Sequence, residues 1–115
     1  MQIRHPREGD VLPLPMMFQS FDPDWIWLMG NAILVAAPAH DTVMLIRLVR
    51  FGDMPPTWIN RMLKQAIKES RDRGFRRYMT WLSSDNEEEK KLKTIAQRYG
   101  ANCEPFKGDL AIGVL

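Results

Sequence analysis

The residues best suited to chemistry in this chain are few and form no familiar catalytic pattern. His5 and His40 are its two histidines, and His40 lies beside Asp41 in a predicted turn. A His–Asp pair can serve catalysis or metal binding, but no third ligand lies at helical or hairpin spacing from this pair. There is also no glycine-rich phosphate loop and no Ser–His–Asp order. The sequence therefore predicts no metal site, and the catalytic residues stay unknown at this stage.

A basic cluster is the other pattern that could bind a ligand. It surrounds Gly74 and consists of Arg71, Arg73, Arg76 and Arg77. Phosphate or nucleic-acid binding is the less favoured interpretation, because Phe75 and Tyr78 are the only aromatic residues that interleave with it. The net charge of +2 is also too slight to indicate a nucleic-acid partner.

Composition places the chain among ordinary globular proteins. Hydrophobic residues make up 45% and charged residues 26% of its 115 residues, which fits a single domain over residues 1–115. No apolar run approaches the roughly 20 residues that span a bilayer, and the N-terminus lacks the apolar stretch of a signal peptide. The single cysteine, Cys103, cannot form an internal disulfide, which favours a reducing compartment. We therefore expect a cytoplasmic protein with no membrane partner.

The first 51 residues predict mainly strands. We expect a short strand over residues 2–4, a short or broken helix over 11–18, where two prolines interrupt it, and a turn over 21–24. Three strands of an antiparallel meander follow, over residues 25–28, 32–36 and 42–51. Residues 42–51 are apolar on both faces, with Val43, Leu45, Arg47 and Val49 on one of them. This pattern favours a central strand that is covered on both sides.

The strongest helical pattern covers residues 57–73. Thr57 is a credible N-cap, and Gly74 is a typical C-terminal stop. The apolar residues recur at helical spacing and form one stripe: Ile59, Met62, Leu63, Ala66 and Ile67. We expect this stripe to face the sheet.

The remaining residues predict a strand, a second helix and two final strands. The strands cover residues 75–82, 102–106 and 110–115, and the helix begins near Asn86 and ends before Gly100. Leu92, Ile95 and Ala96 form its buried stripe. The whole order, β-α-β-β-β-α-β-α-β-β, predicts an α+β fold with a mixed sheet, in which residues 42–51 and 75–82 pair in parallel.

This order, with its sequence marks, resembles the GNAT (Gcn5-related) N-acetyltransferase superfamily over nearly the whole chain. The marks are Ile3-Arg4 with Asp10 at the start, the Gly74-Phe75 exit of the long helix, and the Tyr99-Gly100-Ala101 exit of the last helix. The resemblance implies an acyl-CoA-dependent N-acyltransferase, with acetyl-CoA as cofactor. It also implies that the segment between residues 42–51 and the long helix grips the pyrophosphate with backbone N–H groups.

That segment departs from the family pattern. Pro55 and Pro56 carry no N–H to donate, and Thr57 and Ile59 occupy the positions of the family's two small residues. The expected cofactor site is therefore partial and consists of the residues around the helix start, with two arginines that could compensate through their side chains: Thr57, Trp58, Ile59, Asn60, Arg50 and Arg61. We expect weak or absent acetyl-CoA binding.

The acid–base groups depart as well. Ala96 occupies the position where many family members have a tyrosine, and Tyr99 lies on another side of the helix. Arg50 stands where a general base is often supplied, and the family's second helix is missing. A non-catalytic GNAT-fold interaction protein is therefore the alternative, as in the degenerate GNAT-like proteins that phages encode, where a virion location is also open.

A partner surface is the last expectation from sequence. The chain has eight methionines and four tryptophans, which are many for its length. Trp25 and Trp27 lie two residues apart on one face of a strand, so they are expected to serve either in the core or in self-association or docking.

Overall fold

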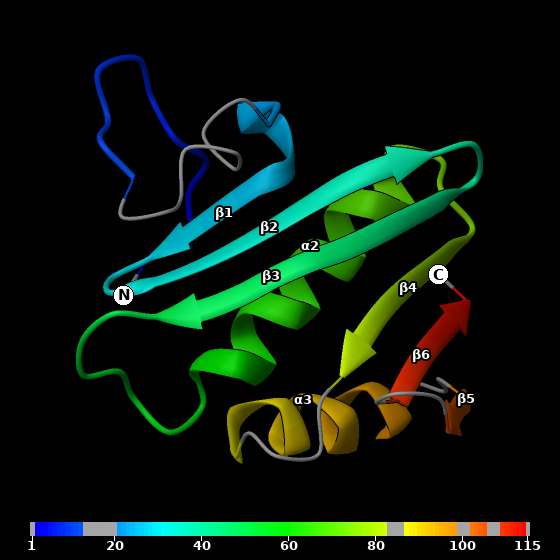
Figure 1. Cartoon of the computed structure of the whole chain (residues 1–115). Coiled ribbons are helices and arrows are strands. Elements are labelled where there is room, and N and C mark those ends of the chain that lie inside the picture. Colours follow the sequence, from blue (N-terminus) through cyan, green and yellow to red (C-terminus); the bar gives the residue numbers. More distant parts are fainter. Residues whose placement is uncertain (1, 13–20, 83–86, 99–101, 106–108, 115) are drawn as a thin grey trace.

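A mixed β-sheet forms the centre of the molecule, with helix α2 along one face (Figure 1). The computed structural model describes residues 2–12, 21–82, 87–98, 102–105 and 109–114. Its elements in chain order are η1 (Pro23–Trp25), β1 (Ile26–Met29), β2 (Ala32–Ala39), β3 (Thr42–Arg50), α2 (Trp58–Asp72), β4 (Arg77–Leu82), α3 (Glu87–Arg98), β5 (Asn102–Pro105) and β6 (Asp109–Val114). In the described part of the chain, no helix is long and apolar enough to cross a membrane.

The sheet has six strands in the order β1-β2-β3-β4-β6-β5. β3 and β4 are parallel, with α2 in the connection between them, and the other described pairs are antiparallel. This arrangement confirms the predicted mixed sheet, the meander and the parallel pairing. The prediction is wrong at residues 2–4, where Arg4 forms an isolated bridge with Leu28 and no strand develops. The predicted broken helix over 11–18 lies mostly outside the described residues.

The β2 strand is longer than predicted and runs through Pro38 to Ala39. Its pairing with β1 ends at Val35, so β3 is its one described neighbour beyond that point. A strand that is an edge can accept a proline, since no neighbour needs the missing N–H. The turn to β3 is made at His40, whose φ of 57° lies in the left-handed region, and Asp41.

A β-bulge interrupts β3 at Ile46. Val35 pairs with Arg47 and the next residue, Ala36, pairs with Leu45, so Ile46 is the extra residue. The bulge shifts the alternation of side chains. Val43 and Leu45 are buried against α2, but Leu48 and not Arg47 continues that face. The predicted single face of Val43, Leu45, Arg47 and Val49 is therefore wrong, and so is the cover on both sides, because Ile46 is 39% exposed.

The main core lies between α2 and the sheet. Ile59, Met62, Leu63 and Ala66 are buried and Ile67 packs against them, which confirms the predicted stripe. From α3, Ile95 packs against the same core. The side chains of Leu92 and Ala96 lie outside the described part.

Both ends of α2 are well defined. Thr57 is the N-cap residue, although its side chain makes no capping hydrogen bond. At the other end Gly74 has a φ of 93°, and the N–H of Phe75 donates to the Ser70 carbonyl at 3.1 Å. This is the glycine stop that the sequence predicts. β4 begins at Arg77, two residues later than predicted.

Candidate functional site

The parallel strands β3 and β4 separate toward their carboxyl ends. Their pairing runs from Thr42 with Arg77 to Leu45 with Thr80 and ends where the bulge at Ile46 begins. Figure 1 shows the two strands diverging beyond that point, with the first turn of α2 and the whole of α3 near the opening. In sheets with parallel strands, ligands bind outside the carboxyl ends of the strands where neighbouring connections part. A ligand site is therefore expected at this end of the sheet.

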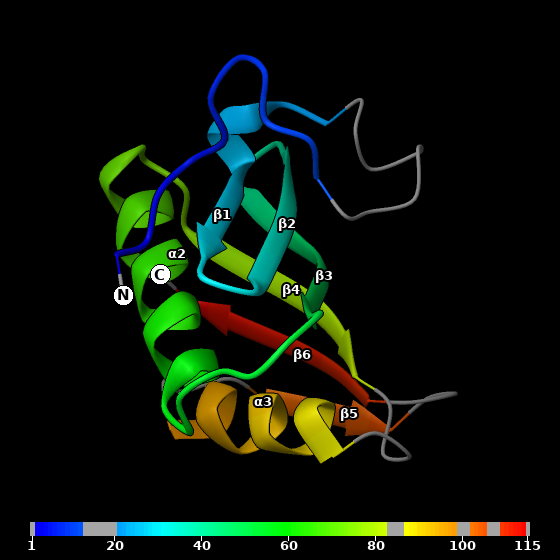
Figure 2. The same ribbon diagram turned by 90° about the vertical axis from the view of Figure 1, so that its left-hand side faces the viewer.

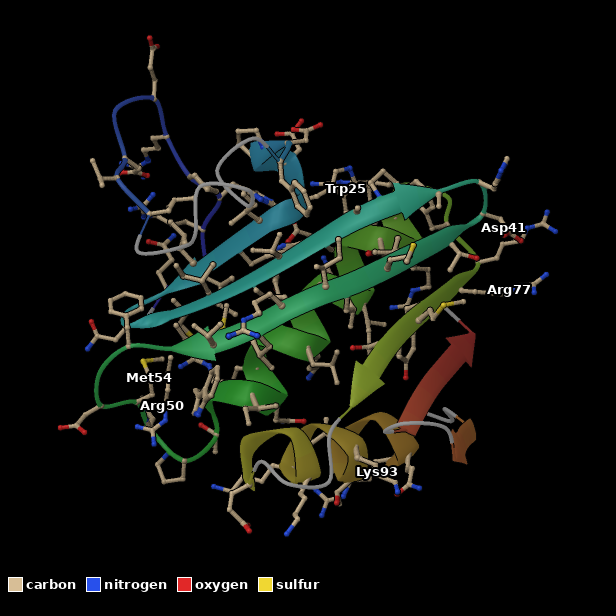
Figure 3. All side chains as sticks on the ribbon, viewed as in Figure 1. Trp25, Asp41, Arg50, Met54, Arg77 and Lys93 are labelled. Carbon is tan, nitrogen blue, oxygen red and sulfur yellow. The ribbon has the colours of Figure 1, made fainter. Side chains whose placement is uncertain are left out.

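The loop between β3 and α2 is tied to the β1–β2 turn through Asn31. The N–H of Phe51 donates to the Asn31 carbonyl at 2.9 Å, and the Asn31 side-chain amide donates to the Asp53 carbonyl at 3.4 Å. The Asn31 N–H also points to the Met54 sulfur at 3.3 Å. Figure 3 labels Met54 and Arg50 at this end of the molecule. These contacts fix the position from which α2 starts.

A groove lies between the first turn of α2 and one side of α3. Its volume is about 440 Å³. On the α2 side it is lined by Pro56, Thr57, Ile59 and Asn60, and on the α3 side by Glu87, Lys90, Lys91, Thr94, Ile95 and Arg98. Figures 1 and 2 both show α3 lying across the end of the molecule next to the start of α2. The two helices are separated in the sequence by strand β4, and the fold brings them together.

The groove is electropositive. Three of its lining residues are cations and one is a carboxylate. Lys90 Nζ pairs with Glu87 Oε1 at 3.2 Å. Lys91 and Arg98 form no ion pair with any of the side chains that the structure describes, and both are exposed. The N-terminal end of α2 adds the positive end of its dipole, so the groove favours an anion.

The backbone of the α2 start has few donors for that anion. Pro55 and Pro56 carry no N–H, and the N–H of Trp58 donates to the Pro55 carbonyl at 3.0 Å. The N–H of Arg61 donates to the Thr57 carbonyl, as in any first helical turn. The site therefore offers its side chains more than its main chain.

The predicted cofactor residues divide into two groups. Thr57, Ile59 and Asn60 line the groove, with Ile59 as a buried apolar floor at 2% exposure. The Trp58 side chain does not line the groove and is buried in the main core. Arg50 and Arg61 are not among the groove-lining residues either. Tyr99 lies outside the described residues.

Sequence reasoning missed the cationic side of α3. Glu87 to Lys91 is a helix start rich in charge, a pattern that by itself indicates solvated surface. The signal was the spacing of Glu87, Lys91, Thr94 and Arg98, which places them on one face of the helix. That pattern becomes a site only when α2 lies opposite to it.

Comparison with known proteins identifies the fold. The sequence matches no protein-family model, and it matches no curated protein. Among solved structures, the chain is similar to the ribosomal-protein-S18-alanine N-acetyltransferase of Escherichia coli, with a TM-score of 0.70 and 15% identity over 99% of this chain and 92% of that one. It is also similar to the PaiA N-acetyltransferase of Thermoplasma acidophilum, solved in complex with coenzyme A, with a TM-score of 0.61 and 12% identity.

The second similarity covers 74% of this chain, which spans 54% of the length of PaiA. Taken together, the two structures establish that the chain has the fold of the GNAT N-acetyltransferases, as the sequence marks predicted.

A second polar cluster lies under the N-terminal segment, around Glu69. Its carboxylate lies 2.8 Å from His5 Nε2 and accepts hydrogen bonds from Gln65 and from the Trp27 indole N–H. The other ring nitrogen of His5 lies 2.8 Å from the Ile26 carbonyl oxygen. Partial burial alone would raise the pKa of Glu69, but the hydrogen bonds from His5, Trp27 and Gln65 hold that pKa below its ordinary value. The cluster joins the N-terminal segment, β1 and α2.

The same region shows where the two tryptophans of the expected partner surface lie. Trp27 is fully buried and Trp25 is 7% exposed. The Trp25 ring packs edge-on against Phe75 and lies 4.5 Å below the Arg73 guanidinium. Arg73 also pairs with Glu69 at 3.7 Å. Both indoles are therefore buried within this chain, and self-association or docking stays a prediction.

The basic cluster and the His–Asp pair have structural contacts of their own. The Arg77 guanidinium lies 3.5 Å from the Asp41 carboxylate, and the Asp41 carbonyl accepts the N–H groups of Arg76 and Arg77. Figure 3 labels Asp41 and Arg77 at the β2–β3 turn, at the far end of the sheet from the loop with Met54. Among the described residues, no three metal-ligating side chains gather.

Proposed function

We propose that this chain is a GNAT-fold, N-acyltransferase-like protein that binds acyl-CoA weakly in the groove between α2 and α3. The observation that carries the proposal is the groove itself. It opens at the N-terminal end of α2, beside the point where β3 and β4 part, and it is lined by Lys90, Lys91 and Arg98. The solved complex of PaiA with coenzyme A supports the choice of this ligand class.

The residues present fit the phosphate-bearing part of such a ligand. The volume of about 440 Å³ lies within the range of small-molecule sites, which is roughly 300–1,000 Å³. Three cations supply charge, and Thr57, Asn60 and Thr94 supply hydroxyl and amide groups at the walls. Lys91 and Arg98 are the residues that we expect to hold the phosphates.

Weak binding follows from the main chain of the loop. A hydrogen bond to a charged acceptor contributes about 1.5–3 kcal/mol, and Pro55 and Pro56 remove two potential donors. Without compensation this loss weakens binding by about two to four powers of ten. Part of it is recovered by the side chains of α3.

Acyl transfer in the groove would need a group that takes the proton of the acceptor amine. When bound, acyl-CoA supplies an acyl group activated as a thioester, whose C–S bond breaks as the C–N bond to the amine forms, while an amine proton passes to the released thiolate. Glu87 is the one carboxylate among the described lining residues, and it is engaged by Lys90. Proton removal from the amine is therefore left to solvent, which predicts slow turnover.

A second candidate is a GNAT-fold binding or assembly component without acyl transfer, whether cytoplasmic or part of a virion. The observation that favours it is the main chain at the start of α2, where two residues are prolines and the N–H of Trp58 donates to the Pro55 carbonyl. The choice between the two candidates depends on whether a CoA thioester binds and is consumed.

Calorimetry with acetyl-CoA and coenzyme A, followed by a thiol-release assay with amine acceptors, tests the proposal. Thr57→Trp fills the groove, and Lys64→Trp places the same bulk on the exposed face of α2 as a matched control. We expect weak binding that Thr57→Trp abolishes and Lys64→Trp leaves unchanged. Micromolar binding with rapid thiol release would contradict the weak site, and absence of any binding would leave the non-catalytic candidate.

A further inference from the structure

We infer that this protein recognises the phosphates of its ligand through side chains of α3, with Lys91 and Arg98 holding two separate phosphate groups. The inference rests on the proposed function, because it names the recognition elements of the same groove. It replaces the expectation that Arg50 and Arg61 compensate for the prolines, since neither residue lines the groove.

The first argument is the state of the cations. Lys90 pairs with Glu87 at 3.2 Å, whereas Lys91 and Arg98 have no ion-pair partner among the side chains that the structure describes. Both line the groove and are exposed, so they face a ligand without first breaking a contact. Arginine suits this role, because its planar fork can hold a phosphate with two hydrogen bonds.

The second argument is their spacing. Lys91 and Arg98 are seven residues apart, which corresponds to about 10 Å along the helix axis at 1.5 Å per residue. If the two side chains extend straight out from the helix, their charged groups stay about that far apart, which is more than one phosphate group spans. The pair therefore fits a ligand with two phosphate sites, such as the pyrophosphate and the 3′-phosphate of coenzyme A.

Thr94 lies between these two cations in the same lining, one turn from each. Its hydroxyl donates to the Lys90 carbonyl at 3.2 Å, so the oxygen lone pairs and not the proton face the groove. Thr94 therefore separates the two cationic positions without adding a donor of its own. The phosphate contacts fall to Lys91 and Arg98.

The experiment compares three ligands against matched variants by calorimetry or NMR titration. The ligands are coenzyme A, 3′-dephospho-coenzyme A and pantetheine, which carry two phosphate sites, one and none. The variants are Lys91→Ala and Arg98→Ala, with Lys64→Ala as a control that removes the same charge from the exposed face of α2. Thermal melts of all three check that the fold is intact.

We expect Lys91→Ala and Arg98→Ala each to weaken coenzyme A binding about tenfold, which is 1.4 kcal/mol. One of the two variants should lose this effect with the dephospho ligand, because its phosphate is then missing. Lys64→Ala should change nothing, and pantetheine should bind every variant equally and more weakly. These losses should shrink as salt rises.

Two outcomes would overturn the inference, and they differ from failure of the proposed function. If coenzyme A binds wild type and both variants equally, the proposed function stands, but Lys91 and Arg98 do not hold the phosphates. If pantetheine binds as tightly as coenzyme A, the phosphates do not contribute to binding, and the inference is likewise wrong. If coenzyme A does not bind at all, both the proposed function and the role of Lys91 and Arg98 are wrong.

Discussion

At the residue scale, Glu69 is a polar residue whose contacts join three parts of the fold. It connects the N-terminal segment through His5, strand β1 through Trp27, and its own helix through Gln65 and Arg73. The helical pattern places Glu69 with its charged, exposed neighbours on the solvent side of α2. The helical pattern could not distinguish it, because its partners are 42 and 64 residues away.

The lowered pKa of Glu69 makes stability depend on acid pH. A carboxyl group whose pKa is lower in the folded state stabilises the fold above the unfolded value, which is 4.5 here, and loses that contribution as pH falls through the folded value. We expect Glu69→Gln to lose about 1–3 kcal/mol of folding free energy at pH 7, because the amide has one acceptor oxygen instead of two for the donors His5, Trp27 and Gln65. Urea melts at pH 7 and pH 3 measure both effects.

In these melts, the difference between wild type and Glu69→Gln should narrow toward pH 3. Asp72→Asn, an exposed carboxylate on the same helix, is the control and should change stability little. A difference that stays constant with pH would show that the ionised carboxylate is not what stabilises the cluster.

Leu63 is a second residue whose substitution tests the fold, because it packs α2 onto the sheet. It is 1% exposed and lies in the middle of the buried stripe. Leu63→Ala should cost about 2–5 kcal/mol, the usual range for a large deletion in a core. Denaturant melts check this, and Lys64→Ala, the exposed neighbour, should stay within about 0.5 kcal/mol of wild type.

At the element scale, the loop over residues 51–57 determines where α2 begins and therefore where the groove opens. Gly52 fits because a Cβ there would lie 2.6 Å from the Asn31 side-chain nitrogen and 2.9 Å from its Cγ. That nitrogen donates to Asp53, so it cannot simply move aside without losing a contact of the loop. The absence of one side chain thus preserves the link between the β1–β2 turn and α2.

Gly52→Ala should therefore destabilise the fold by about 1–3 kcal/mol, as overpacking does. The cause can be isolated with a double-mutant cycle, because Asn31→Ala removes the two clashing atoms. We expect Gly52→Ala to cost clearly less in the Asn31→Ala background, as measured by urea melts. Equal costs in both backgrounds would rule out the clash with Asn31.

An element can be predicted from the sequence when the interactions that form it are between residues close in the sequence, and not when they are between distant ones. The stripe of α2 and its stop at Gly74 depend on local period and backbone freedom, and both were predicted correctly. The bulge at Ile46 depends on how β2 and β3 register, which alternation alone cannot show. The groove depends on α3 lying against α2, so its cations had no visible partner element in the sequence.

At the scale of the whole molecule, the fold is that of the GNAT N-acetyltransferases, and the sequence order was enough to indicate it. The order of strands and helices is a global pattern that tolerates local errors such as the missing first strand. The candidate site is less predictable, because a few side chains decide it. Trp25 illustrates the same limit: the pair of indoles suggested a surface, and long-range contacts with Phe75 and Arg73 bury it.

A substitution of Trp25 tests whether this residue serves the core or a partner surface. Trp25→Phe should lower stability, because it removes buried area and the contact with Arg73, yet leave the oligomeric state unchanged. Thermal melts and sedimentation at several concentrations measure the two effects. If wild type self-associates and Trp25→Phe alone abolishes it at intact fold, the indole takes part in an interface after all.

The parallel pairing of β3 and β4 also bears on how the chain folds. β1, β2 and β3 are joined by tight turns, so their contacts are local and can form within microseconds. β4 can pair with β3 only after the chain between Arg50 and Arg77 has returned along the sheet. Contacts of such sequence separation raise the contact order and slow folding. The three-stranded meander is therefore expected to form first, and the end of the sheet where the groove opens is expected to assemble last.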